Sequence, residues 1–268
     1  MRCSGATPRE VWCAPGSFQA LRYTRRSLID HQKLEALPAA ELVSWAVETY
    51  GNSFAISNSF QKEDMVLVDL ASRAGGPFRI FTLDTGRLHD ETYQMMETVR
   101  ERYGVRVEPA FPDRIEVERM VAERGPNLFY GSVEARKMCC EVRKVRPLER
   151  KLGEFRAWAT GLRREQTQAR AEIRRVEETA GRLKLNPLAD WTTAQVEEYT
   201  RSHSVPVHPL YARGFPSIGC APCTRAIEPG ESERAGRWWW EQGGPRECGI
   251  HFAPDGSVQR IATAPKDS

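Results

Sequence analysis

The sequence predicts an α/β fold, a doubly wound and mostly parallel sheet flanked by helices. Two observations carry this prediction. Short apolar segments typical of buried strands alternate, over residues 38–202, with segments whose apolar residues recur every three or four positions. Polar turns directly follow two of the apolar segments. Alternation of this kind favours parallel strands, because the linking helices then cover both faces of the sheet.

The chain is long enough to bury a sizeable core. It has 268 residues, of which 40% are hydrophobic and 28% charged, which excludes disorder of the whole chain. Residues 1–28 contain prolines, glycines and arginines without periodicity, and we expect a disordered tail there, with an arginine-rich targeting peptide as the alternative. Residues 29–240 are predicted to form the α/β domain, and residues 241–268 a C-terminal segment.

The elements can be assigned in order along this domain. Residues 38–50 have an apolar helical face that includes Leu42 and Val43. Residues 54–60 begin as an apolar strand and end in a polar turn. The elements expected next are a helix over 63–73, a strand over 78–83, a helix over 89–103, a strand over 105–107, a helix over 115–123, a strand over 157–160 and a helix over 193–202. Thr192 is a suitable N-cap for the last helix.

Two polar turns lie where predicted strands end, at residues 57–64 and 84–87. In parallel sheets, ligands bind beyond the carboxyl ends of the strands, so these turns are candidates for a binding cleft. From about residue 206 onward Pro, Gly, Cys and Trp dominate, and regular structure is hard to place.

The charge balance restricts the function classes. The formal net charge is +3, which does not indicate the strongly basic coat of a nucleic-acid-binding protein. No uncharged apolar run approaches the roughly 20 residues of a membrane helix. The N-terminus also lacks the apolar region of a secretory signal. We therefore expect a cytoplasmic protein without membrane or nucleic-acid partners.

Seven cysteines remain to be explained, and four of them form two groups. Cys139 and Cys140 are adjacent, and Cys220 and Cys223 form a CxxC motif. Four thiolates can hold a 4Fe–4S cluster or a tetrahedral zinc ion. Two adjacent cysteines strain to reach one small ion, so the spacing favours the cluster. Zinc and a structural or redox-active pair remain open.

Cys248 lies apart from these groups, in a polar and glycine-flanked segment. A lone cysteine is commonly an inert core residue. This composition argues against burial, and the nearby Arg246 and His251 can stabilise a reactive thiolate. Cys3 and Cys13 fall in the predicted tail, where we expect no role for them.

Several cationic residues could converge on the predicted cleft. They are Lys144, Arg163, Arg164, Arg170, Arg234 and Arg237. Any one of them could be a solvated surface charge. Together at a strand-end cleft they would bind phosphate or sulfate, for which arginine offers two parallel donors. Arginine and tryptophan could also read nucleic acid, but the near-neutral charge favours a small anion.

These motifs in this order resemble the assimilatory adenylyl-sulfate (APS) reductases, the iron–sulfur branch of the APS/PAPS reductase family, over roughly residues 40–252. The matching segments are Ser59-Phe60-Gln61-Lys62-Glu63-Asp64, Leu83-Asp84-Thr85-Gly86-Arg87-Leu88-His89, Cys139-Cys140 with Arg143-Lys144, Trp158-Ala159-Thr160-Gly161-Leu162-Arg163-Arg164, Ile218-Gly219-Cys220-Ala221-Pro222-Cys223-Thr224-Arg225, Gly236-Arg237-Trp238-Trp239-Trp240 and Glu247-Cys248-Gly249-Ile250-His251. The cysteine pair, the CxxC motif and the last of these segments are specific to the family.

The resemblance implies a fold related to the N-type ATP pyrophosphatases. It implies reduction of adenylyl sulfate to sulfite and AMP with reduced thioredoxin, in sulfate assimilation for cysteine biosynthesis. Cys248 would be the nucleophile and would carry a Cys-S-sulfonate intermediate. Cys139, Cys140, Cys220 and Cys223 would bind one 4Fe–4S cluster. The substrate contacts that it implies are Ser59, Leu83, Asp84, Thr85, Gly86, Lys144, Arg163, Arg164, Arg170, Arg234, Arg237 and His251.

The chain departs from its relatives at the phosphate loop. It reads Ser-Phe-Gln-Lys-Glu-Asp over residues 59–64, where many relatives have Ser-Gly-Ala-Glu-Asp. No thioredoxin-like domain follows Cys248, so we expect thioredoxin as a separate protein, and we expect a homo-oligomer. The alternatives are a PAPS reductase, although that branch typically lacks the four cysteines, and an RNA-binding or tRNA-thiolating protein of the same fold.

Overall fold

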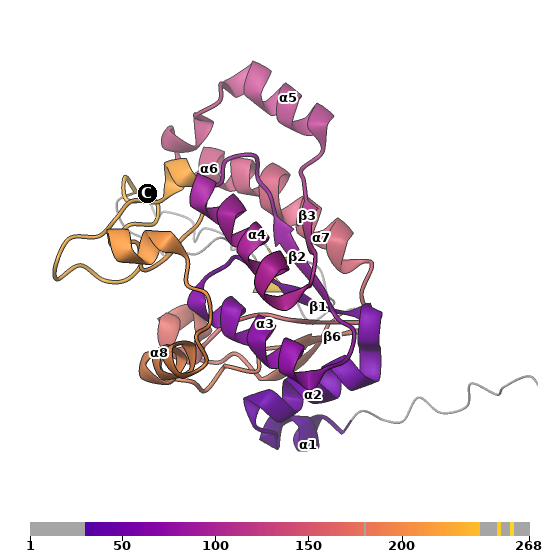
Figure 1. Cartoon of the computed structure of the whole chain (residues 1–268). Helices are drawn as coiled ribbons and strands as arrows, with labels where there is room; N and C mark the ends of the chain where they lie inside the picture. The colour runs from indigo at the N-terminus through magenta and orange to yellow at the C-terminus, as the bar shows by residue number, and fades with distance from the viewer. Residues whose placement is uncertain (1–29, 180, 242–250, 253–257, 260–268) are drawn as a thin grey trace, which may run out of the picture. The chain divides into compact units, whose positions relative to one another are not determined.

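Six strands form one sheet, in the order β3 (Val107–Ala110), β2 (Arg79–Leu83), β1 (Phe54–Ser57), β4 (Ala157–Ala159), β6 (Arg182–Leu185) and β5 (Val176–Thr179) (Figure 1). This computed structural model describes residues 30–179, 181–241, 251–252 and 258–259. All neighbouring strands are parallel except β5 and β6. On the central strand, Ile56 pairs with Ile80 on one side and Ala159 on the other. The predicted mostly parallel sheet is confirmed.

The two faces of the sheet bury different side chains, because successive residues of a strand point to opposite faces. Phe54 and Ile56 of β1 join the larger cluster of the core, whereas Ala55 joins a smaller one with Phe81 and Trp158. The larger cluster includes residues of α2 (Ala39–Tyr50), α3 (Lys62–Ala74), α4 (Asp90–Tyr103) and α8 (Thr193–Ser202). The smaller one includes residues of α7 (Arg146–Leu152). Helices therefore cover both faces, as predicted.

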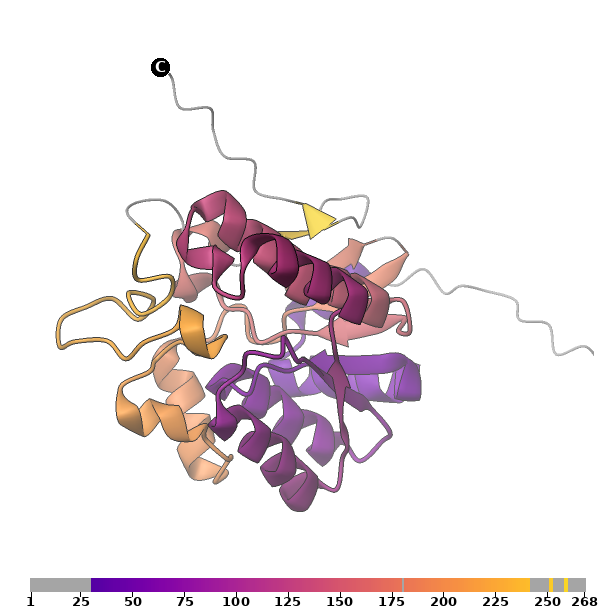
Figure 2. The same cartoon turned by 90° about the horizontal axis from the view of Figure 1, so that it is seen from above.

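Helix α3 follows the central strand β1 in the chain and packs with other helices on one face of the sheet. It contacts both α2 and α8 and lies between them in both views (Figure 1, Figure 2). Its residues Met65 to Val68 are fully buried. The N-terminus of α3 therefore stands at the carboxyl end of β1 on a rigid support, where the sequence places its first polar turn.

The predicted helices and strands are found with small shifts, and strand β3 differs most. The prediction of residues 105–107 was wrong, since β3 pairs with β2 over Val107–Ala110. Gly104 ends α4 in the left-handed conformation, and the two residues after it serve as a linker to the strand. The register is set by the partner strand, which local periodicity does not reveal.

Other elements had no sequence prediction. They are α1 (His31–Ala36), the β5–β6 hairpin, α6 (Val133–Cys140), a π-helical turn (Glu141–Val145) and α7. Only β6 of the hairpin alternates charged and apolar residues, and the segment from α6 to α7 is rich in charge. Helix α5 (Arg114–Arg124) matches the expected 115–123 within one residue at each end.

The chain divides into two compact units, Met1–Asp30 and His31–Ser268, and every element named so far belongs to the second. The second unit also contains β7 (His251–Phe252) and β8 (Val258–Gln259), which pair antiparallel. The predicted tail over 1–28 lies outside the described residues, as does most of the predicted segment 241–268. None of the described helices has the length and apolar character needed to cross a membrane.

Candidate active-site cleft and four-cysteine cavity

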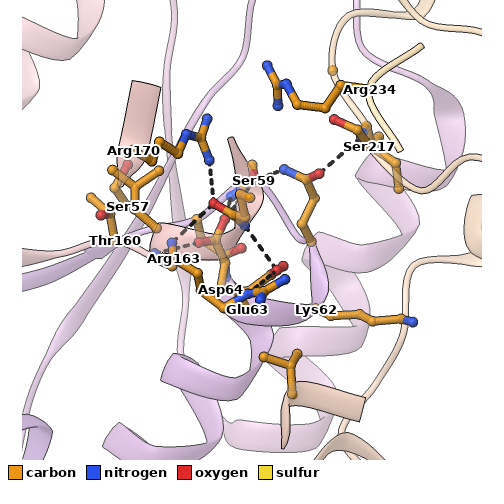
Figure 3. Close-up of a pocket in the computed structure, with 18 of the residues that line it drawn as sticks. Ser57, Ser59, Lys62, Glu63, Asp64, Thr160, Arg163, Arg170, Ser217 and Arg234 are labelled. Carbon is orange, nitrogen blue, oxygen red and sulfur yellow. Dashed lines mark hydrogen bonds and ion pairs between the residues drawn. The ribbon is translucent and has the colours of Figure 1, made fainter. Parts of the chain in front are cut away.

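A cleft of about 750 Å³ opens at the carboxyl ends of β1, β2 and β4. Its walls come from the turn between β1 and α3, the loop after β4, helix α8 and the segments that contain Tyr211, Ser217 and Arg237. In Figure 3, Arg163 and Arg170 approach it from the loop after β4, and Arg234 lies near Ser217 on another wall. The location agrees with the strand-end site that the sequence predicted.

The turn between β1 and α3 is held by its own side chains. The backbone N–H and the hydroxyl of Ser59 both donate to Asp64 Oδ2, at 2.7 Å each. Asn58 Oδ1 accepts from the N–H of Phe60 at 2.6 Å. Phe60 has a φ of 61°, the left-handed conformation that favours glycine. Its fully buried ring packs in the core, so burial offsets the backbone strain and the turn forms without glycine.

Asp64 also ties this turn to the loop after β4. The Gly161 N–H donates to Asp64 Oδ1 at 3.1 Å. A Cβ atom at Gly161 would lie 2.5 Å from that oxygen, so only glycine fits without movement. Burial raises the pKa of the Asp64 carboxyl to about 6, although hydrogen bonds from Ser59 and Gly161 oppose the shift. The carboxylate is thus a buried link between two walls of the cleft.

Glu63 organises the arginine-rich loop from the opposite side of the same turn. Its Oε1 accepts from Arg163 Nε at 2.9 Å and from Gln166 Nε2 at 3.0 Å. Gln166 Oε1 in turn accepts from the Arg163 N–H at 3.1 Å and from Arg170 Nη1. Arg170 therefore reaches the cleft from a loop that Glu63 and Gln166 hold in place.

The two adjacent arginines after β4 have different surroundings. Arg163 lines the cleft but is 3% exposed, and it also donates to the Trp191 carbonyl at 3.1 Å. Arg164 is not among the residues that line the cleft. Its Nε donates to the Ile173 carbonyl at 2.9 Å, and its guanidinium pairs with Asp190. Arg163 thus lines the cleft and stabilises the loop through its hydrogen bonds, whereas Arg164 does not line the cleft.

Of the predicted substrate contacts Leu83, Asp84, Thr85 and Gly86, only Leu83, the last residue of β2, lines the cleft. Asp84 instead closes its own turn, since Oδ1 accepts from the Gly86 N–H at 2.8 Å and from the Tyr93 hydroxyl at 3.1 Å. Thr85 is fully buried, and its hydroxyl lies 3.3 Å from Cys220 Sγ. Asp84, Thr85 and Gly86 therefore do not line the cleft, and Thr85 contacts one of the cysteines instead.

Cys139, Cys140, Cys220 and Cys223 are free thiols and line one small cavity of about 20 Å³. Cys139 and Cys140 end helix α6, and the π-helical turn follows directly; such turns are frequent at functional sites. Cys220 is the N-cap of the short 3₁₀ helix Ala221–Cys223, and Cys223 is its last residue. Within the described part of the chain, no three His, Cys, Asp or Glu side chains form a group that could hold a single metal ion.

The electrostatics of this cavity disfavour bare thiolates. Burial raises the pKa of the Cys223 thiol to about 12, and the neighbouring Cys220 raises it further. Burial also raises the pKa of Cys139, against the opposing effect of Arg143. Thiolates are the metal-binding form, so a positive centre between these side chains would be required to keep them ionised.

Lys144 lines both the cleft and the four-cysteine cavity. Arg237 also lines the cleft, where its Nη1 donates to the Ile218 carbonyl at 3.2 Å and its guanidinium lies 4.7 Å from the Trp238 ring centre. Arg234 lines the cleft as well. Of the predicted cations, Lys144, Arg163, Arg170, Arg234 and Arg237 therefore meet at this cleft.

Two predicted residues cannot be placed in it. Cys248 lies outside the described residues, and His251 is described only as part of the backbone of β7. Sequence reasoning also missed Gln166 and Thr92, which line the cleft. Neither residue has a spacing or a motif that distinguishes it from a solvated polar side chain.

Known proteins of one family are similar to this chain in sequence. Residues 53–226 match the phosphoadenosine phosphosulfate reductase domain. The chain is 55% identical over 198 residues to the adenosine 5'-phosphosulfate reductase of Burkholderia cepacia, covering 73% of this chain and 79% of that protein. It is 49% identical over 208 residues to the protein of the same name from Allochromatium vinosum, covering 76% and 81%.

A solved structure agrees with the sequence matches. The phosphate complex of phosphoadenylyl-sulfate (PAPS) reductase from Candida auris is similar, with a TM-score of 0.59 and 28% identity, over 72% of this chain and 92% of that one. The matched domain contains both cysteine motifs and most residues that line the cleft, and the chain belongs to the APS/PAPS reductase family.

Proposed function

We propose that this protein reduces adenylyl sulfate to sulfite and AMP in sulfate assimilation. Two relatives with close sequence similarity are named as reductases of this nucleotide, which supports the proposal. The observation that carries it is that Lys144 lines both the cleft and the cavity of the four cysteines. An anion cleft joined to a four-thiol site is the arrangement expected of the iron–sulfur branch of the family.

The cleft has the charges that such a substrate requires. A thiolate nucleophile is repelled by a sulfate, so cations must neutralise that sulfate before attack. Lys144, Arg170, Arg234 and Arg237 line the cleft and can do so. Ser59 stands just before the N-terminus of α3, where backbone N–H groups favour a phosphate.

Cys248 supplies the chemistry in this proposal, on the basis of the family resemblance. Its thiolate attacks the sulfate sulfur and forms an S–S bond, while the S–O bond to AMP breaks and AMP leaves with that electron pair. A thiolate of reduced thioredoxin then attacks Cys248 Sγ, and sulfite leaves with the electron pair of the S–S bond. The second thioredoxin thiol closes the thioredoxin disulfide and releases the Cys248 thiolate.

The four cysteines fit a 4Fe–4S cluster by their number and by the cavity that they share. Burial raises the pKa of Cys139 and Cys223, so these thiols would ionise at neutral pH only beside a positive centre such as the cluster. When bound, the cluster would supply an electrostatic field next to Lys144. The two electrons of the reaction are balanced by the dithiol of thioredoxin, so this chain needs no further donor.

The test of the cofactor is purification without oxygen, followed by the visible spectrum and by iron and sulfide analysis. We expect a coloured protein with about four irons and four sulfides per chain. A colourless, active protein that contains zinc would overturn the assignment. Size-exclusion chromatography and fractionation of cells would test the homo-oligomer and the cytoplasmic location that we also propose.

The test of the reaction is sulfite release from adenylyl sulfate with thioredoxin. We expect Cys248→Ser to abolish sulfite formation and Cys13→Ser, at a cysteine outside the matched region, to retain it. Sulfite formation by Cys248→Ser would overturn the mechanism. Equal concentrations of adenylyl sulfate and its 3'-phosphorylated form distinguish the two substrates, and preference for the latter would make the protein a PAPS reductase.

A further inference from the structure

Two buried hydrogen bonds link the backbone of Leu210, through the His208 ring, to Thr92 at the cleft. The backbone N–H of Leu210 donates to His208 Nδ1 at 3.3 Å, and His208 Nε2 lies 3.1 Å from the hydroxyl of Thr92. His208 is 1% exposed and Thr92 is 4% exposed. Thr92 belongs to the first turn of α4 and lines the cleft, although no sequence motif singles it out.

The direction of each hydrogen bond follows from the donors. A backbone N–H can only donate, so Nδ1 of His208 must be the acceptor and carries no proton. A neutral imidazole then has its proton on Nε2, which donates to Thr92 Oγ. Oγ is thus an acceptor in this contact, and its own proton is available for another acceptor.

No partner for that proton is found among the residues that the structure describes. Threonine hydroxyls in helices commonly donate to the carbonyl four residues earlier, as Thr98 does to Gln94 at 3.0 Å on the same helix. Thr92 has the His208 ring as its side-chain partner within the described ranges. Since Thr92 lines the cleft, a molecule bound there can supply the acceptor.

We propose that Thr92 is a substrate-binding residue that donates a hydrogen bond to an acceptor atom of the bound nucleotide. His208 is a positioning residue that acts through Thr92. Its Nε2–H donates to Thr92 Oγ, so the hydroxyl proton of Thr92 is directed toward the cleft. This inference rests on the proposed function for the identity of the ligand as adenylyl sulfate.

The surroundings of His208 keep its ring neutral, which preserves the direction of both hydrogen bonds. Burial lowers the pKa of His208 to about 4, and the neighbouring His89 lowers it further, against the opposing effect of Glu91. His89 is itself held neutral by burial, with additional lowering of its pKa by Arg213 and Arg237. At neutral pH His208 therefore keeps its Nε2 proton and does not become a donor at both nitrogens.

The test measures adenylyl sulfate binding by calorimetry in a Cys248→Ser background, where no S-sulfonate forms. Thr92→Val keeps the shape and removes the hydroxyl, and we expect about threefold to tenfold weaker binding, the effect of one lost hydrogen bond. Thr92→Ser should restore most of the affinity. Thr98→Val is the matched control, the same change on the same helix at an exposed hydroxyl that bonds to its own helix, and should bind like the parent.

A second pair of variants tests the role of His208 even if Thr92→Val fails to fold. His208→Gln can still donate from the position of Nε2, whereas His208→Asn keeps only an acceptor at the position of Nδ1. We expect His208→Asn to lose affinity and His208→Gln to recover most of it. In turnover the affected variants should raise KM more than they lower kcat, which a loss of fold would not do.

The outcomes separate this inference from the proposed function. If the Cys248→Ser parent does not bind adenylyl sulfate, the proposed function is overturned and this inference with it. If the parent binds and folded Thr92→Val binds within twofold of it, this inference is wrong and the proposed function stands. Equal affinities for His208→Asn and His208→Gln would overturn the positioning role of His208.

Discussion

Gly161→Ala tests the link between the phosphate turn and the loop after β4. The new Cβ would lie 2.5 Å from Asp64 Oδ1, 2.7 Å from Glu63 Cβ and 2.9 Å from the Asp64 nitrogen. Gly161 is not among the residues with positive φ, so the obstacle is steric and not conformational. To reach ordinary contact distances the loop and α3 must separate by roughly 1 Å, a typical overpacking strain of about 1–3 kcal/mol.

That separation also affects a hydrogen bond. The Gly161 N–H donates to the buried Asp64 carboxylate at 3.1 Å, and hydrogen bonds to charged groups contribute about 1.5–3 kcal/mol. Overpacking relieved by movement forfeits part of this bond, so the two effects are not simply additive. We expect a total loss of about 3 kcal/mol. For a domain of this size that lowers the melting temperature by about 6–12 °C.

Thermal unfolding and adenylyl sulfate binding together check this prediction. Gly131→Ala is the control, since Gly131 has helical φ and its nearest obstacle is the Leu128 carbonyl at 3.3 Å. The control should change stability by less than about 1 kcal/mol. A Gly161→Ala protein that melts within about 2 °C of the parent and keeps its affinity would refute the reasoning.

Three further predictions concern buried groups elsewhere. Phe60→Gly relieves about 1–2 kcal/mol of left-handed strain but removes a fully buried ring worth about 3–5 kcal/mol, so denaturant unfolding should show a net loss. Arg136→Met leaves the buried carboxylate of Glu241 without its partner at 2.6 Å, and should destabilise by about 3–5 kcal/mol; a melting temperature equal to that of the parent would contradict this. His208 has a pKa lowered to about 4 by burial, so the folded state binds its proton less readily than the unfolded state does. Its contribution to stability is complete above about pH 6.5 and falls by about 2 kcal/mol at pH 5, a loss that unfolding at the two pH values should find diminished in His208→Gln.

The roles of the cations show where sequence reasoning succeeded and where it could not. The arginine-rich loop after β4 was expected at a strand-end cleft, and Arg163 and Arg170 do line that cleft. Which arginine faces inward depends on partners far away in the chain. Arg163 is bound by Glu63, 100 positions earlier, whereas Arg164 pairs with Asp190. No local pattern distinguishes these two neighbours.

The phosphate turn shows a different limit. The loop around Phe60 departs from the motif of many relatives, and this left the geometry of the turn open at the level of sequence. The structure has the left-handed φ all the same, because the ring is completely buried among the residues of the core. The energy that decides the backbone conformation therefore comes from tertiary packing, which a single motif does not contain.

The sequence by itself determined the alternating order of strands and helices, the parallel sheet with its binding edge, and the grouping of four cysteines apart from Cys248. These follow from periodicity and motif spacing, which are local properties of a chain. Only the tertiary structure decided that Asp84, Thr85 and Gly86 do not line the cleft, that Thr85 contacts Cys220, and that Thr92 lines the cleft with the His208 ring beside its hydroxyl. Side-chain direction and hydrogen-bond partners depend on contacts between segments more than 100 residues apart, and those exist only once the sheet has formed.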